Sequence, residues 1–179
     1  MKGFEQDMVK ALSTLGYYAM MDAYKQRGFK HRTRNLRESY ASAVYVRGKL
    51  IESSKRYIGT SYNRKRDPKT KKTGRETVDD WLRSHSFGQT DNEIVLVVIA
   101  AMYYAGILES EWQTGKRAEL KKKHKKRNPT SYPDRIIVIS PARDFINQHY
   151  HWFVYKVYEK YGMQDKVPTA RIIKGEKLK

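Results

Sequence analysis

The side chains best suited to metal chemistry are His149 and His151, and their spacing does not form a site. They stand two apart in a segment with helical spacing, so they point to different faces of a helix. The chain has no cysteine, and no pair of carboxylates lies at helical spacing beside these histidines. Zinc sites need several such ligands together. We therefore expect no metal and no cofactor.

Acid pairs occur at Asp79–Asp80 and at Glu109 and Glu111. Neither pair has a nucleophile or a proton donor beside it, as general acid–base or covalent catalysis would require. Adjacent aspartates also diverge on a helix. The acids alone therefore predict a protein that is not an enzyme.

Two tyrosine segments indicate a different chemistry. The first is Ala43-Val44-Tyr45, and after eleven intervening residues comes Tyr57-Ile58-Gly59, followed by Asn63, Arg64 and Arg66. This spacing resembles the signature of GIY-YIG endonucleases, which use a tyrosine, an arginine and a metal-binding glutamate to cut phosphodiesters. Ala43 stands where that family has glycine, a polar stretch follows where it has a helix, and Glu109 is the available distant acid. A nuclease of this type is one alternative function.

Positive charge is concentrated in two blocks of the sequence. The chain has 37 Lys and Arg against 19 Asp and Glu, a net charge of +18. We predict long exposed basic loops at 53–72 and 110–134. A surplus of this size attracts polyanions, so an anionic partner is expected, either nucleic acid or an acidic protein surface. The candidate binding residues are Lys55, Arg56, Arg64, Lys65, Arg66, Lys71, Lys72, Lys121, Lys122, Lys123, Lys125, Lys126 and Arg127.

Length and composition limit the cellular setting. The 179 residues suit one domain, and the absence of cysteine suits a reducing cytoplasm. The longest apolar run, 94–105, is well below the roughly 20 residues that span a bilayer. We expect a protein made in the cytoplasm, with no membrane partner.

Hydrophobic periodicity predicts an α+β fold, with a small, mostly antiparallel sheet packed by an N-terminal and a C-terminal helix. Helical spacing covers 4–27, and a hairpin with a turn at Arg47-Gly48-Lys49 covers 40–51. A short helix capped by Thr73 or Thr77 runs to about Ser84.

The second half of the chain adds two strands, a helix and an arm. The apolar segment 93–102 predicts a central strand covered on both faces, and 135–139 predicts another buried strand. Ser140 and Pro141 begin a helix with Trp152 on its apolar stripe, and Gly162 ends it. We predict one domain over 1–162. An extended arm over 163–179 then offers Val167, Ile172 and Ile173 to a neighbouring subunit.

Two short motifs carry a family resemblance. Thr33, Asn35, Leu36 and Ser39 lead from the first helix into the first strand, and Met102, Tyr104, Ala105, Leu108 and Glu109 follow the apolar strand. With this order of elements, the chain resembles the head–tail joining and tail-completion proteins of tailed bacteriophages. Arg34 stands where that family usually has glycine, and the insert 110–134 is long.

The resemblance implies a structural virion protein without an active site. It implies a homo-oligomeric ring of six or twelve subunits in the neck or tail region, assembled in the bacterial host between the portal and the tail. Its partners would be the portal, neighbouring neck or tail proteins and the packaged DNA. A free nucleic-acid-binding protein without sequence specificity remains the main alternative.

Overall fold

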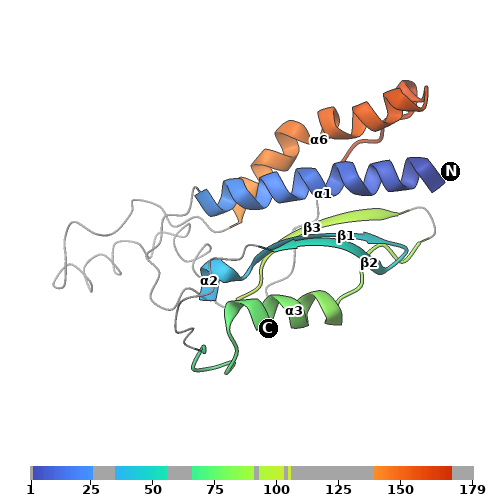
Figure 1. Ribbon diagram of the computed structural model, residues 1–179. Helices are drawn as coiled ribbons and strands as arrows, with labels where there is room; N and C mark the ends of the chain where they lie inside the picture. Colours follow the sequence, from blue (N-terminus) through green and yellow to red (C-terminus); the bar gives the residue numbers. More distant parts are fainter. Residues whose placement is uncertain are drawn as a thin grey trace, which may run out of the picture.

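The chain folds into three layers in the computed structural model. The helices α1 (Lys2–Lys25) and α6 (Ser140–Lys160) cover one face of an antiparallel sheet, and α3 (Gly74–Ser84) covers the other (Figure 1). The predicted α+β architecture, with a sheet packed by an N-terminal and a C-terminal helix, is thus confirmed. The structure describes residues 2–25, 35–55, 66–90, 93–102, 105 and 139–170.

The described sheet has the order β2-β1-β3, with β1 (Tyr40–Val46) paired antiparallel to both β2 (Lys49–Lys55) and β3 (Ile94–Ala100). Every residue of β1 is buried, whereas β3 is half-buried throughout. The middle strand of the described sheet is therefore β1 and not the predicted 93–102, and 135–138 of the other predicted strand lie outside the described residues. Side chains of β3 do pack into clusters on both faces, as that apolar run indicated.

The predicted hairpin is confirmed, and its turn explains the local sequence. Arg47 and Gly48 both have positive φ, 51° and 77°. Positive φ at both central positions defines a type I′ turn, whose twist matches that of the flanking strands. The hairpin extends to Lys55, so 53–55 belong to β2 and not to the predicted loop.

A glycine brings α1 close to the sheet. A Cβ placed on Gly16 would lie 2.6 Å from Cδ1 of Leu96 and 3.0 Å from Cβ of Ser42. The helix therefore crosses β1 and β3 at short range and buries Leu12 and Leu15 beside it. This close approach makes the apolar layer between α1 and the sheet.

A local signal determines the beginning of helix α3, on the opposite face of the sheet. Thr73 is its N-cap, since its Oγ1 accepts from the Glu76 amide while the Glu76 carboxylate accepts from the Thr73 amide. This reciprocal capping box satisfies two free amide groups. The short helix α2 (Asn35–Glu38) lies against this end (Figure 1), where Asn35 Oδ1 accepts from the Gly74 amide at 3.2 Å.

The beginning of α6 differs from prediction, and its end agrees. Ile139 is the N-cap and makes no side-chain capping bond, and Ser140 is the first helical residue. At the other end, Gly162 has φ 66°, its amide donates to Glu159 O, and the Met163 amide donates to Tyr158 O. These two bonds form a Schellman motif, which favours glycine at this position.

The apolar stripe of α6 also differs from the prediction. Val154 and Val157 are buried, and Ile146 and Phe153 pack beside them, whereas Trp152 is 60% exposed. Tyrosines and histidines occur around most of this helix, so hydrophobicity alone did not distinguish the buried side. Packing against α1 decides it.

The chain after Gly162 folds back at first. Residues Gln164–Lys166 form the short 3₁₀ helix η1, and the half-buried Val167 packs against the cluster between α1, α6 and the sheet. Val167 therefore packs against its own chain, in place of the extended arm predicted there. Ile172 and Ile173 lie outside the described residues.

Candidate partner-binding surfaces

Cations of the first basic block pair with carboxylates of α3. Lys55 of β2 binds Asp79 in a partly buried ion pair. Two exposed pairs follow: Lys72 Nζ lies 2.6 Å from Asp80 Oδ2, and Arg66 Nη2 lies 3.2 Å from Glu76 Oε1. The structure thus supplies an acidic partner from within the chain for three of the candidate polyanion-binding residues.

The segment 66–72 is an ordered turn in place of the predicted loop. The carboxylate of the buried Asp67 accepts from the amides of Lys69 and Thr70, each at 2.9 Å. The Asp67 amide donates to Lys72 O at 2.8 Å, and Lys71 adopts a positive φ of 58°. This turn holds Lys72 beside α3 and leaves Lys71 exposed.

Two carboxyl groups of α3 titrate below their ordinary range. The backbone amide and then the hydroxyl of Thr73 lower the pKa of Glu76, with a smaller contribution from Arg66. The hydrogen bond from Lys72 lowers the pKa of Asp80. Both carboxylates are exposed, so these effects are local and sensitive to salt.

The remaining candidates lie outside the described residues: Arg56, Arg64, Lys65, Lys121, Lys122, Lys123, Lys125, Lys126 and Arg127. The described residues contain 17 Lys and Arg and 13 Asp and Glu, a surplus of four. The rest of the sequence contains 20 Lys and Arg and 6 Asp and Glu, a surplus of 14 positive charges. Most of the net charge therefore belongs to segments beyond the described fold, and any polyanion binding would depend mainly on them.

Tyr45 is placed as a core residue. Its side chain is fully buried between β1 and α3, its hydroxyl donates to Leu82 O at 3.2 Å, and its ring meets Phe87 edge-on at 5.2 Å. Burial raises the pKa of the Tyr45 phenol. A nuclease tyrosine must reach a phosphodiester, and this one is covered by α3. The partner segment Tyr57-Ile58-Gly59 lies outside the described residues, as does Glu109.

The histidines and acids singled out in the sequence do not meet. His149 Nδ1 lies 2.8 Å from Phe145 O of its own helix, and His151 stacks on Tyr155. Asp79 and Asp80 each bind a lysine. Across the described ranges, no three His, Asp or Glu side chains gather as metal ligands would.

The two motifs of the family resemblance come together in space. Leu36, Met102 and Ala105 belong to one buried cluster at the α2 end of the sheet. Between them, Ser39 O accepts from the Ala101 amide at 3.0 Å, and Ser39 Oγ donates to Leu36 O at 2.9 Å. More than sixty residues of chain separate the motifs, and both serve one junction. Thr33, Arg34, Tyr104 and Leu108 lie outside the described residues.

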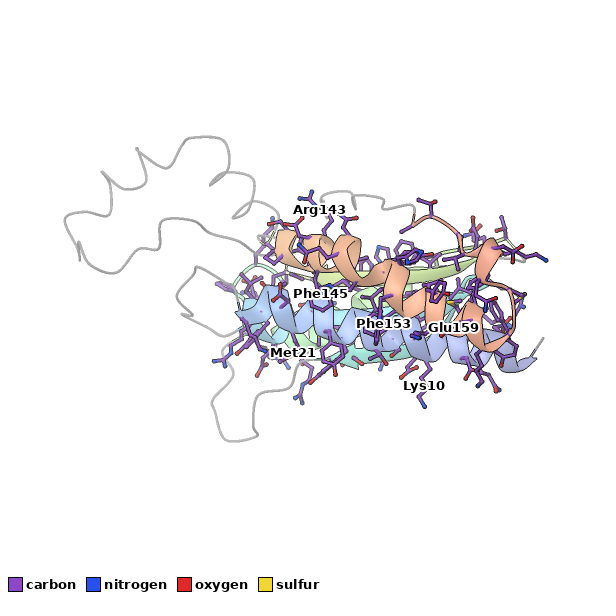
Figure 2. The ribbon with its side chains drawn as sticks, turned by 90° about the horizontal axis from the view of Figure 1, so that it is seen from above. Lys10, Met21, Arg143, Phe145, Phe153 and Glu159 are labelled. Atoms are coloured by element: carbon purple, nitrogen blue, oxygen red, sulfur yellow. The ribbon has the colours of Figure 1, made fainter. Side chains whose placement is uncertain are left out.

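An open groove of about 250 Å³ runs between α1 and α6. Its lining comes from both helices and is mainly apolar, with Trp152 among its members and Phe153 directed toward α1 (Figure 2). Charged side chains also reach it: Asp7, Lys10 and Lys156. Lys160 and then Tyr161 bind the Asp7 carboxylate and lower its pKa. The groove had no sequence signal, because it depends on which side of α6 faces α1.

The strand β2 presents a second apolar surface. Leu50 and Ile51 are 39% and 54% exposed. The register changes from Val44–Glu52 to Tyr45–Leu50, which leaves Ile51 without a partner on β1. Such a bulge bends the strand and re-aims a side chain. Among the described strands, β2 is an edge, so the bulge directs Ile51 to an accessible border of the sheet.

Comparisons with known proteins found no family model, no curated protein and no solved structure that matches this chain. Of the described helices, none is both long enough and apolar enough to cross a membrane.

Proposed function

We propose that this chain is a structural subunit of a bacteriophage neck or tail-completion ring, which acts by binding its neighbours and not by catalysis. The observation that carries the proposal is the junction of the two resemblance motifs. Leu36 from the first motif shares one buried cluster with Met102 and Ala105 from the second, and Ser39 O accepts a hydrogen bond from the amide of Ala101, the residue before Met102. Motifs that share one structural role support the resemblance more strongly than two separate short matches do.

The surface chemistry agrees with a protein that binds other proteins. Large apolar and aromatic side chains stand exposed at several places in the described residues, among them Trp152 on α6, the Leu50-Ile51 pair on β2 and the Tyr17-Tyr18 pair on α1. Exposed aromatic and aliphatic clusters are typical of protein interfaces. The ring is proposed to join the portal to the tail in the virion, with six or twelve copies.

A nucleic-acid-binding protein is the second candidate, and one observation favours it. The surplus of 14 positive charges outside the described fold is not offset by neighbouring acids in the sequence. In a ring, the same charge can meet packaged DNA or the acidic surface of an adjoining ring. The GIY-YIG alternative is disfavoured, because α3 covers the Tyr45 hydroxyl.

Native mass spectrometry at moderate salt tests the proposal, with the chain alone and mixed with phage portal and tail proteins. We expect closed rings, or a defined complex with one of those proteins. A persistent monomer that joins no virion protein and binds DNA, with an affinity that falls steeply with salt, would support the second candidate. Magnesium-dependent cleavage of DNA that Tyr45→Phe abolishes would refute both.

A further inference from the structure

The groove between α1 and α6 offers a site for another chain. Two of its cations differ in their engagement: Lys156 Nζ binds Glu159 at 2.8 Å, whereas Lys10 Nζ forms no direct hydrogen bond or salt bridge within the described part of the chain and is attracted to Asp7 only at longer range. Beside Lys10 lie the exposed Trp152 indole and the half-buried Phe153 ring. A ligand that matches this groove carries aliphatic groups next to one carboxylate.

The same protein displays such a group at another place. Ile51 is directed outward by the bulge, Leu50 precedes it, and Glu52 follows it on the exposed edge of β2. In the described residues the Glu52 side chain forms no ion pair or hydrogen bond, so its carboxylate is available. A short exposed segment thus combines two aliphatic side chains with one carboxylate.

We infer that the Leu50-Ile51-Glu52 edge of one subunit docks in the α1–α6 groove of the next subunit, with Ile51 against Trp152 and Glu52 beside Lys10. This inference rests on the proposed ring. The donating edge and the receiving groove are different surfaces, so each subunit uses both once. Such a head-to-tail contact closes into a ring when the rotation between subunits permits it.

The physical basis is the combination of apolar burial with a paired charge. Ile51 and Trp152 both lose exposed apolar surface in the contact, which is the main favourable term in association. The Glu52–Lys10 pair selects the register, because the alternative of bringing two like charges together is unfavourable. The alternative is symmetric pairing of the β2 edges of two subunits. It is less favourable, because it would leave Lys10 and Trp152 exposed to solvent.

The absence of native cysteine permits a direct test by disulfide crosslinking. One preparation carries Ile51→Cys and the other carries Thr14→Cys, at an exposed groove position. After mixing and oxidation we expect a disulfide between the two variants and little dimer from either alone. In the control, the Ile51→Cys preparation is mixed with Gln164→Cys, which is also at an exposed position. This mixture should give little disulfide between the two variants.

Charge reversal supplies a second readout. Lys10→Glu or Glu52→Lys alone should weaken assembly by about tenfold, and the double variant should recover most of the loss. Two results together would overturn this contact and leave the ring proposal standing. The chain would form closed rings, yet the double variant would not recover assembly and the Ile51→Cys and Thr14→Cys variants would not crosslink. Monomers at every concentration, with no crosslink, would overturn both. Efficient dimers of Ile51→Cys alone would overturn it in favour of edge-to-edge pairing.

Discussion

The two faces of the sheet are closed by different kinds of contact. On one face, α1 and α6 pack through apolar clusters in which Leu15, Val44 and Val154 are fully buried. On the other face, α3 combines a smaller apolar cluster with the Lys55–Asp79 pair and the Asn35–Gly74 hydrogen bond. Apolar packing tolerates small adjustments of side chains, while a hydrogen-bonded backbone junction does not. The two faces should therefore respond differently to small changes.

The largest effect is expected where backbone meets backbone. A Cβ on Gly74 would lie 1.9 Å from the Asn35 carbonyl oxygen, a backbone atom, whereas a Cβ on Gly16 would meet side-chain atoms, Leu96 Cδ1 at 2.6 Å and Ser42 Cβ at 3.0 Å. We expect Gly74→Ala to lower the free energy of unfolding by about 3 kcal/mol, through overpacking at the α2–α3 junction. Gly16→Ala is the matched change, and its effect should stay within about 1 kcal/mol because alanine favours a helix interior. Urea denaturation measures both, and equal losses would contradict the proposed difference between the faces.

Two residues of α6 separate its buried side from its exposed side. Val154→Ala removes buried methyl groups between α1 and α6 and should lower the free energy of unfolding by about 2 kcal/mol. Trp152→Ala should change it by less than about 0.5 kcal/mol, because Trp152 is 60% exposed. Thermal unfolding at matched pH compares them. If Trp152→Ala lowered the unfolding free energy more than Val154→Ala does, the buried side of α6 would be the one predicted from the sequence, which contains Trp152.

A substitution of Tyr45 tests the contribution of the α3 face of the sheet alone. Tyr45→Phe retains the ring packing against Phe87 and removes the hydrogen bond to Leu82 O. We expect a loss of about 1 kcal/mol in unfolding free energy, with no change in the oligomeric state that native mass spectrometry measures. Chemical denaturation and native mass spectrometry on the same samples measure the two quantities. A change of oligomer without any loss of stability would place Tyr45 in an interface and not in the core.

The smallest effect concerns acid stability. The pKa of Asp7 on the α1–α6 face and those of Glu76 and Asp80 on the α3 face are all lowered by hydrogen bonds in the folded state. Groups with a lowered folded pKa stabilise the fold above their ordinary pKa, and this stability is lost as the pH falls. We expect the melting temperature to decline from about pH 5 downward. Glu76→Gln should flatten this decline, and Asp165→Asn, which changes an exposed carboxylate, should leave it unaltered.

Several features of the fold could be predicted because their causes are local. Positive φ at Arg47 and Gly48 makes a hairpin turn, Thr73 with Glu76 makes a capping box, and Gly162 ends α6. Each signal operates within a few residues, so it can be read in order along the chain. The absence of a thiol-based metal site is likewise a matter of composition alone.

Other features depended on which distant segments meet. The hydrophobicity of 94–100 is greater than that of 40–46, yet β1 is the middle strand of the described sheet because both its neighbours pair with it. From the sequence, Lys55 and Lys72 were predicted to bind a polyanion. In the structure, Asp79 and Asp80 of α3 form ion pairs with them. By itself, the sequence determined the turns, the caps and the surplus of charge. The tertiary structure alone decided strand order, the exposure of Trp152 and the position of the groove, since burial and ion pairing depend on contacts between residues far apart in the chain.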